Sequence, residues 1–465
     1  MLTLLLNGEE EPNAIASHGT RILSAEVTDD GEPVQVEFLR DGVPIGTTTT
    51  APHEVALSMS SLDSGARTYE AIVTDAEGET ASDTLDVSIN IVGGVVEAVN
   101  GDLFSGGIHD AGADQAVGGG LAATGTDVFI AGVSDDDQGV LLRTNSDLEV
   151  QWEQRFGDGI RTAPAPTSDG QVAVGVEEDG SWTVRVVSQL DGSTSESWVL
   201  GPAPLSDGGL GPLLSVAGER LDVTENPLDV VRFGDLNTTR RSVLFESEDV
   251  VFDLATARDG ETVLIGYGSV FGFSDVPCAT TSRRCVAALS PQGETIWEVG
   301  LTDLTAGIPH LAPSPTGEVF VATDVYADGG GSYLLLRVSQ SGAVELEARH
   351  GEEALDAQLE EGDRVAAASP HPSGGIVVCG THGPFVAGLG QTGFTPTPFV
   401  ALYDEQLNLV WETREVIEPE LGGGYTIGCA ATSEDVFAYG LRGHVAADDG
   451  NPVIEGQAWV ARLSL

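Results

Sequence analysis

The sequence contains no lysine, because all 20 of its basic residues are arginine, and they stand against 73 aspartate and glutamate residues. The missing amine excludes Schiff-base chemistry, the P-loop lysine and the Ser-x-x-Lys nucleophile pair. The formal net charge of −53 excludes duplex nucleic acid and anionic membrane surfaces as partners, since both are bound by Lys and Arg that neutralise phosphates. No run approaches the roughly 20 apolar residues that a membrane span needs.

Standard catalytic and metal-binding strings are also missing. The sequence has no Gly-x-Ser-x-Gly, His-Glu-x-x-His or Cys-x-x-Cys string, and its eight histidines lack the spacing of metal ligands. We therefore predict no catalytic residue and no cofactor. A hydrophobic content of 41%, with 60 glycines and 22 prolines, indicates instead a folded, turn-rich chain.

The negative charge is spread along the whole chain. Residues 1–92 hold 17 acidic residues and 3 arginines, and the remaining residues hold 56 and 17. An evenly distributed negative charge is typical of highly soluble proteins and of proteins adapted to salt. It therefore indicates the environment of the protein rather than a binding site. The apolar start lacks the basic and small-residue parts of a signal peptide and predicts a first β-strand; we expect an export signal outside the given sequence.

Residues 22–89 alternate apolar and polar side chains in short runs separated by Asp/Gly turns. This pattern predicts the antiparallel strands of a β-sandwich. The string VTDDGEPVQVEFLRDGVPIG, followed by YEAIVTDAEG, resembles the bacterial immunoglobulin-like domains, and it lacks the Cys, Trp and Cys core of antibody domains. The resemblance covers about residues 2–92 and implies a spacer or adhesive module, so we place the first domain at residues 1–92.

After residue 93 the sequence repeats itself. An apolar strand that ends in glycine recurs at Gly132, Gly175, Gly266, Gly380 and Gly440. Two weaker copies, at Thr224 and Thr323, bring the number of repeats to seven. A polar turn leading to an aromatic-ended strand recurs at Trp152, Trp297 and Trp411. A β-propeller blade typically consists of four short strands in about 50 residues. We therefore place a propeller at residues 93–465.

The two ends of the repeat region predict how the propeller closes. The last repeat stops after three strands, and an orphan strand from Val95 to Asn100 precedes the first blade. Pairing these ends would remove exposed sheet edges. The predicted fold class is all-β: an N-terminal Ig-like β-sandwich plus a seven-bladed β-propeller of four-stranded blades, whose ring is closed by the strand from Val95 to Asn100.

The turns that end in tryptophan, above all ALSPQGETIW, resemble the repeats of quinoprotein-like propellers. This family includes PQQ dehydrogenases and non-enzymatic outer-membrane assembly factors. Ser290 stands where the family pattern has Asp, and the turn is one residue shorter. The resemblance implies a PQQ-like repeat fold. It does not extend to the cofactor pocket, because the sequence has neither an adjacent cysteine pair nor a lysine.

The predicted innermost strands, which line the channel of a propeller, are small and nearly uncharged. Only Asp253, His310 and His371 offer titratable groups there. No general acid or base with a positioned partner is evident among them, so we expect structural roles for all three.

Loops between the second and third strands of the blades emerge on one face of a propeller, which we call the long-loop face. These loops are short and acidic in blades 1–3 and long in blades 4–7. Loop aromatics can mark recognition surfaces, and the alternative is that the rings pack the loops onto the blades. The candidate binding residues are Phe271, Phe273, Tyr326, His382, Phe385, Phe394 and His444.

The four cysteines indicate an oxidising compartment. Cys278 and Cys285 lie in one long loop, and their spacing predicts a loop-closing disulfide. Cys379 and Cys429 fall on strands of consecutive blades, where buried free thiols and an inter-blade bridge both remain open.

Oxygen-rich Asp/Gly turns offer weak candidates for Ca²⁺ at Asp135, Asp136, Asp328 and Asp448. None of them matches the EF-hand spacing, and Asp/Gly turns are common in hairpins. We predict no metal site, with Ca²⁺ as the alternative.

The sequence predicts an exported, non-catalytic protein of the cell surface, periplasm or extracellular space that binds a protein or glycan through the long-loop face. One alternative is a propeller-type polysaccharide hydrolase or lyase, which needs two facing carboxylates about 5–10 Å apart in a cleft. The other is a structural subunit of an extracellular assembly or filament, joined through the Ig-like domain or a sheet edge. The sequence assigns no oligomeric state.

Overall fold

The structure is a computed structural model, and the regular secondary structure of its described part is almost entirely β-strand. It describes residues 2–465 except 9–14, 17–18, 29–34, 60, 102, 110–119, 135, 137, 158, 161, 168–169, 203–212, 218–219, 227–228, 234–240, 247–249, 258, 269–283, 302–306, 328–329, 351–360, 373, 385–396, 415, 417–423 and 449–450. Within these residues the helical structure is a single 3₁₀ turn, η1 (Ser61–Asp63), and no helix has the length and apolar character to cross a membrane. The predicted all-β class is confirmed.

The chain divides into two compact units. The N-terminal unit comprises Met1–Val95 with residues 433–435 and 464–465, and the C-terminal unit comprises Val96–Thr432 with Val436–Leu463. The N-terminal unit has two antiparallel sheets, β1 (Leu2–Leu6), β2 (Gly19–Val27) and β5 (His53–Met59) in one, and β4 (Val43–Thr48), β3 (Gln35–Arg40), β6 (Gly65–Thr74) and β7 (Thr80–Ile89) in the other. Their inward-facing apolar side chains share one core, as in a β-sandwich.

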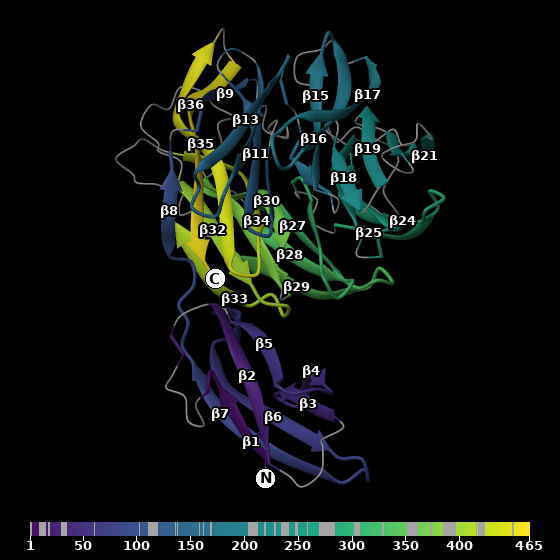
Figure 1. Ribbon diagram of the computed structural model, residues 1–465. Coiled ribbons are helices and arrows are strands. Elements are labelled where there is room, and N and C mark those ends of the chain that lie inside the picture. Colours follow the sequence, from purple (N-terminus) through teal and green to yellow (C-terminus); the bar gives the residue numbers. More distant parts are fainter. Residues whose placement is uncertain are drawn as a thin grey trace. The chain divides into compact units, whose positions relative to one another are not determined.

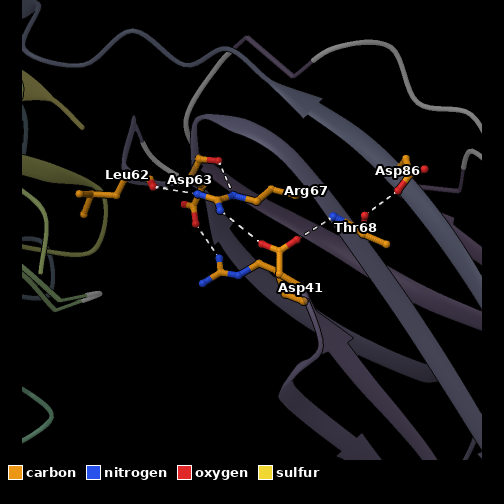
Figure 2. Close-up of polar contacts among 7 residues, drawn as sticks. Asp41, Leu62, Asp63, Arg67, Thr68 and Asp86 are labelled. Atoms are coloured by element: carbon orange, nitrogen blue, oxygen red, sulfur yellow. Dashed lines mark hydrogen bonds and ion pairs between the residues drawn. The ribbon is translucent and has the colours of Figure 1, made fainter. Parts of the chain in front are cut away.

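A polar network fastens one turn of this sandwich (Figure 2). The guanidinium of Arg67 donates to the backbone oxygens of Asp63, at 3.0 Å, and Leu62, at 3.4 Å, and to the carboxylate of Asp41, at 3.3 Å. Asp41 begins the β3–β4 turn with a φ of 52°, and its carboxylate accepts the amide of Thr68 at 2.9 Å. The Asp/Gly turn that the sequence predicts here is thereby tied to both η1 and β6.

The C-terminal unit is built from four-stranded antiparallel meanders (Figure 1), which we call modules 1 to 7 in chain order. Module 1 contains β10 (Gly120–Thr124), β11 (Asp127–Val133), β12 (Gly139–Thr144) and β13 (Val150–Phe156). Module 2 contains β14 (Ala165–Pro166), β15 (Gln171–Glu178), β16 (Ser181–Ser188) and β17 (Thr194–Pro202). Module 3 contains β18 (Leu214–Ala217), β19 (Arg220–Asn226), β20 (Asp229–Phe233) and β21 (Arg241–Glu246).

Module 4 contains β22 (Val250–Thr256), β23 (Val263–Gly268), β24 (Arg284–Leu289) and β25 (Thr295–Gly300). Module 5 contains β26 (His310–Pro313), β27 (Val319–Ala327), β28 (Gly330–Val338) and β29 (Val344–His350). Module 6 contains β30 (Glu361–Pro370), β31 (Ile376–Pro384), β32 (Thr397–Tyr403) and β33 (Leu409–Arg414). A parallel bridge between Gly331 and Gly362 joins modules 5 and 6 into one eight-stranded sheet.

Module 7 is completed by a strand from far away in the sequence. Its own strands are β34 (Gly424–Ala431), β35 (Asp435–Asp448) and β36 (Asn451–Ser464), and β8 (Val96–Asn100) pairs antiparallel with the end of β36, as predicted. A further strand, β9 (Ser105–His109), pairs with the first half of β36 and was not foreseen in the sequence. Modules 7 and 1 share one hydrophobic core, and the side-chain amide of Asn100 donates to the carbonyl of Leu148 at 3.0 Å.

The glycine signature of the repeats has a steric cause. A Cβ at Gly380 would lie 1.8 Å from the carbonyl oxygen of Arg364, and one at Gly440 would lie 1.9 Å from that of Tyr425. Both oxygens belong to innermost strands whose pairing is shifted by a bulge at this level. The extra residue of a bulge bends its strand, and only glycine leaves room for the carbonyl that is pushed toward the second strand.

The tryptophan signature also has a structural role. Trp152 of module 1 lies against Gly192 of module 2, and its indole N–H donates to the carbonyl of Gln189 at 2.9 Å. Trp297 of module 4 lies in the same way against Gly342 of module 5. In both places a fourth strand docks its tryptophan on the last turn of the next module.

An arginine contact between neighbouring modules recurs around the C-terminal unit. A guanidinium Nη1 from the third strand of one module donates to a backbone carbonyl in the last turn of the next. These pairs are Arg143 to Gln189 at 2.9 Å, Arg337 to Glu405 at 2.8 Å and Arg462 to Ser146 at 2.9 Å. The third pair runs from module 7 back to module 1, so the last module packs on the first as other modules pack on their successors.

Candidate functional site

The structure describes the side chain of one of the seven candidate binding residues. His382 lies near the end of β31, at the level where the loop to β32 begins. Tyr326 in β27 and His444 in β35 lie on described strands, but their side chains fall outside the described part. The phenylalanines Phe271, Phe273, Phe385 and Phe394 lie outside the described residues altogether. The surroundings of His382 therefore define the candidate site.

His382 belongs to a polar network around a buried carboxylate. Its Nδ1 lies 2.8 Å from Oδ1 of Asp363, whose side chain is fully buried while that of His382 is 27% exposed. The guanidinium of Arg414 donates to both oxygens of the same carboxylate, at 3.1 and 2.8 Å. Its Nε donates to Glu412 at 2.5 Å. One carboxylate thus holds an imidazole and an arginine from two other strands.

The register of module 6 explains how these residues meet. Asp363 and His382 are direct partners across β30 and β31, and Arg414 is the partner of Phe399 across β32 and β33. The guanidinium passes over the ring of Phe399, 5.9 Å from its centre, to reach Asp363. Gly380 stands opposite Phe399 in β31, so no side chain blocks this path.

Arg414 keeps its charge in this setting. Desolvation by burial lowers the pKa of its guanidinium, but hydrogen bonds and charge from Asp363 and Glu412 outweigh that effect and raise the pKa above its usual value. Because one guanidinium binds both carboxylates, these two groups do not face each other across an open cleft. The arrangement therefore suits a structural anchor better than the acid and base of a glycosidase.

Two buried tyrosines connect this network to module 5. The hydroxyl of Tyr333 in β28 is hydrogen-bonded to that of Tyr403 in β32. Tyr333 also stacks on Phe399, with ring centres 5.7 Å apart, and the ring of His350 lies 4.4 Å from that of Tyr403. Burial raises the pKa of both tyrosines, so both phenols stay neutral. The ends of β28 and β31 that face the long loops are thus fixed by buried side chains.

Sequence reasoning missed most of this network. Asp363, Glu412 and Arg414 stand in strands as ordinary charged residues, and nothing in their spacing indicates that β33 reaches back to β30. The one available signal was the pair of Glu412 and Arg414 on the last strand of a blade, where alternation alone predicts solvent-exposed side chains.

Buried carboxylates link neighbouring modules to each other. Asp253 accepts the amide of Leu254 at 2.8 Å and that of Leu311, in module 5, at 2.6 Å. Asp324, in the second strand β27 of module 5, accepts the amide of Val365 in module 6 at 2.6 Å. His371, which we expected on an innermost strand, lies instead beyond the end of β30 and is buried in the turn between β30 and β31. Both carboxylates thus bind an amide on the innermost strand of the next module.

We expect Asp253 and His310 to give opposite pH dependences of stability. Desolvation raises the pKa of Asp253 to about 6, although two amide hydrogen bonds lower it, and desolvation lowers the pKa of His310 to about 4. Folded Asp253 therefore retains a proton that the unfolded chain loses, and stability falls as pH rises from about 4 to 6. Folded His310 lacks a proton that the unfolded chain binds, and stability rises from about pH 4 to 6.5.

Denaturant unfolding at pH 4.5, 5.5 and 6.5 checks this expectation in Asp253→Asn and His310→Gln variants. Relative to the parent chain, Asp253→Asn should gain stability with rising pH, and His310→Gln should lose it. Slopes that change in the same direction in both variants would contradict the assignment.

The cysteines fall into two classes. Cys285, buried in β24, is disulfide-bonded, whereas its predicted partner Cys278 lies outside the described residues, so their pairing stays a prediction. Cys379 in β31 and Cys429 in β34 are free and buried in this structure. The Cys429 thiol donates to the carbonyl of Ala367 at 3.6 Å, and burial together with a hydrogen bond to Cys429 raises the pKa of Cys379.

Native protein should therefore be inert to thiol reagents. The thiolate is the reactive form of cysteine, and burial disfavours it. Titration with Ellman's reagent at pH 8 is expected to detect almost no thiol in the native chain. The same titration in guanidinium chloride should detect two, the number of free cysteines. Rapid reaction of native protein would show that the two thiols are accessible.

The weak calcium candidates gain no support from the described residues. Asp136 accepts a hydrogen bond from Ser134 at 2.5 Å and lies 3.6 Å from Arg155. Asp135 and Asp328 lie outside the described residues, as does the side chain of Asp448 at the end of β35. Within the described part, no group of three or more His, Cys, Asp or Glu residues could hold a metal ion.

Comparison with known proteins bears on the N-terminal unit. Residues 11–71 match the family described as Bacterial Ig domain. This Ig-like domain agrees with the two-sheet sandwich of the N-terminal unit and with the resemblance seen in the sequence. No curated protein matches the chain.

Several solved structures resemble the chain at low identity. The WD40 β-propeller domain of Doa1 has a TM-score of 0.48 at 13% identity, with 80% of this chain and 97% of that chain covered. A chain of the mitotic checkpoint complex gives 0.49 at 12%, with 80% and 94% covered. A chain of Kuenenia stuttgartiensis hydrazine synthase gives 0.45 at 12%, with 72% and 94% covered. Likeness at this level carries nothing about activity or partners.

Proposed function

We propose that this chain is an exported, non-catalytic binding protein, in which a bacterial Ig-like domain precedes a quinoprotein-like, seven-bladed propeller that recognises a protein or glycan through its long-loop face. The seven modules are its blades, and β8 closes the ring. The domains are residues 1–92 and 93–465. We propose no resident cofactor and no catalytic residue. The Ig-like domain supports a location at the cell surface or outside the cell.

The observation that carries this proposal is the buried network at the long-loop ends of modules 5 and 6. A fully buried carboxylate bound to Arg414 and His382, together with a buried tyrosine pair, fixes the strands from which long loops leave. Recognition loops are commonly carried on rigid scaffolds of this kind. The three modules with short acidic loops offer no such combination of length and aromatic side chains.

Two further features support a propeller that has the quinoprotein-like fold but not the cofactor chemistry of that family. Trp152 and Trp297 dock on the last turn of the following module, as repeated contacts between blades. Arg462 repeats between modules 7 and 1 a contact that Arg143 makes between modules 1 and 2. These contacts hold neighbouring modules together. We therefore assign ligand binding to the loops rather than to these residues.

The proposal is tested with immobilised bacterial and host polysaccharides and envelope proteins as probes. A triple variant, Phe271→Ser, Phe273→Ser and Phe394→Ser, should lose at least tenfold in affinity for the probes that the parent chain binds. The matched control replaces exposed glutamines in the turns at the opposite ends of the modules, Gln292→Ser, Gln340→Ser and Gln406→Ser, and should bind normally. Unchanged binding by the aromatic variant would overturn the proposal.

The same panel separates the alternatives. A polysaccharide hydrolase or lyase would release reducing or unsaturated ends from the carbohydrate probes. A structural subunit would bind no probe and would associate with itself as its concentration rises, which sedimentation velocity detects.

A further inference from the structure

An open cavity of about 300 Å³ lies between modules 1 and 2. It is enclosed by the end of β13, the loop between β11 and β12, and strands β15 to β17. Its polar lining consists of Gln138, Gln154, Arg155, Glu178, Arg185 and Thr194. A space of this size matches the lower end of small-ligand sites and holds one or two sugar rings.

The cavity contains a preformed pair of opposite charges. Nε and Nη2 of Arg185 donate to the two oxygens of Glu178 at 3.2 and 2.6 Å, and both side chains remain about one quarter exposed. Glu178 ends β15 and Arg185 lies in β16, so neighbouring strands of one sheet hold the pair. Such a bidentate pair has fixed geometry and still offers free donor and acceptor positions at its open edge.

Arg155, the second arginine of the cavity, is also neutralised by nearby carboxylates. Arg155 donates to Glu153 at 2.6 Å and lies 3.6 Å from Asp136, although its side chain is 44% exposed. No excess of positive charge is therefore available for an acidic ligand, and the net charge of −53 repels one at long range. A neutral ligand meets neither obstacle.

The remaining lining residues suit hydroxyl groups. Gln138 and Gln154 offer amides that both donate and accept, Thr194 offers a hydroxyl, and the ring of Phe156, 7% exposed, forms part of the wall. Planar side chains with adjacent donor and acceptor atoms match the two neighbouring hydroxyls of a sugar ring, because each hydroxyl can donate to one atom and accept from another.

We propose that this cavity is a binding site for a neutral saccharide of one or two rings, held through neighbouring hydroxyls by Arg185 and Glu178. The site lies on the same face as the long loops, but its lining residues belong to modules 1 and 2 and none belongs to the long loops of modules 4 to 7. It goes beyond the function proposed above. Arg185 and Glu178 are specificity-determining residues in it, and the amides of Gln138 and Gln154 add contacts at the rim.

The test is ligand-observed NMR followed by calorimetry on the full chain, with methyl glycosides of glucose, galactose and mannose, cellobiose and maltose, and glucuronate and galacturonate as acidic comparators. At least one neutral sugar is expected to bind, with an affinity that changes less than twofold between 50 and 500 mM NaCl. Arg185→Gln and Glu178→Gln should each weaken binding about tenfold or more. Arg21→Gln, at a partly exposed arginine of the N-terminal unit, is the matched control.

Absence of binding at 20 mM of every neutral sugar would overturn the proposal, as would tighter binding of the acidic sugars. Full affinity in Arg185→Gln would also overturn it. If that variant unfolds, Gln154→Ala replaces it, because Gln154 is partly exposed near the strand end, and its affinity should fall at least threefold. The variant lacking Phe271, Phe273 and Phe394 must bind the sugar normally, which separates failure here from failure of the long-loop proposal.

Discussion

Alanine at Gly380 or Gly440 is expected to destabilise the C-terminal unit by at least about 3 kcal/mol and to reduce its soluble yield. The added Cβ would lie 1.8 Å from the carbonyl oxygen of Arg364 in the first variant and 1.9 Å from that of Tyr425 in the second. These neighbours are backbone atoms of bulged inner strands, so relief requires movement of a whole strand rather than a rotamer change.

Gly157 provides the matched control for these variants. A Cβ there would lie 3.6 Å from Cγ of Glu178 and 3.7 Å from the oxygen of Glu177, which are ordinary contacts. Gly157→Ala should therefore change stability by less than about 0.5 kcal/mol. Urea unfolding followed by tryptophan fluorescence measures all three variants. Equal stability of the three would show that the bulged strands do not approach as closely as described.

Removal of the β8 pairing should have the second large effect. Replacing residues 96–100 with Gly-Ser-Gly-Ser-Gly in the full chain keeps its length but removes the side chains that lie along β36. We expect a loss of about 3 kcal/mol or more, since Ala98 packs on the core shared by modules 7 and 1 and the edge of β36 becomes exposed. Exposed edges also promote association, so sedimentation velocity should show oligomers that the parent chain does not form.

A substitution at Arg462 tests the packing of module 7 on module 1 with a smaller change to the chain. Its contact with Ser146 copies the contact of Arg143 with Gln189, and it lies 3.4 Å from Glu97 of β8. Arg462→Gln and Arg143→Gln should each cost about 1–3 kcal/mol. If Arg462→Gln costs nothing while Arg143→Gln is destabilising, modules 7 and 1 do not pack in solution.

The sequence predicted the repeated architecture because its signals are local. Apolar runs ending in glycine mark second strands, since Gly380 and Gly440 meet a carbonyl that no other residue tolerates. The orphan strand near Val96 was recognisable because the last repeat lacked a partner. Polar links between distant strands have no such local signal. Arg414, for example, reaches Asp363 across the two intervening strands β31 and β32. Their meeting depends on register and on the absence of a side chain at Gly380, neither of which spacing reveals.

The candidate binding residues also show that contacts set by strand register cannot be predicted from sequence spacing. The lengths of the loops indicated a face, whereas the pairing of His382 with Asp363 required the register of β30 and β31. The cavity between modules 1 and 2 was equally invisible in the sequence, because Arg185 and Glu178 read there as an exposed pair on a hairpin.

The central claim is that recognition occurs at the long-loop face. Hydrogen exchange of the full chain, with and without the tightest probe from the polysaccharide and envelope-protein panel, tests it most directly. Slower exchange is predicted in residues 269–283 and 385–396 and at the adjoining ends of β31 and β32. Slower exchange confined to the turns at the opposite ends of the modules, or to the Ig-like domain, would contradict the claim.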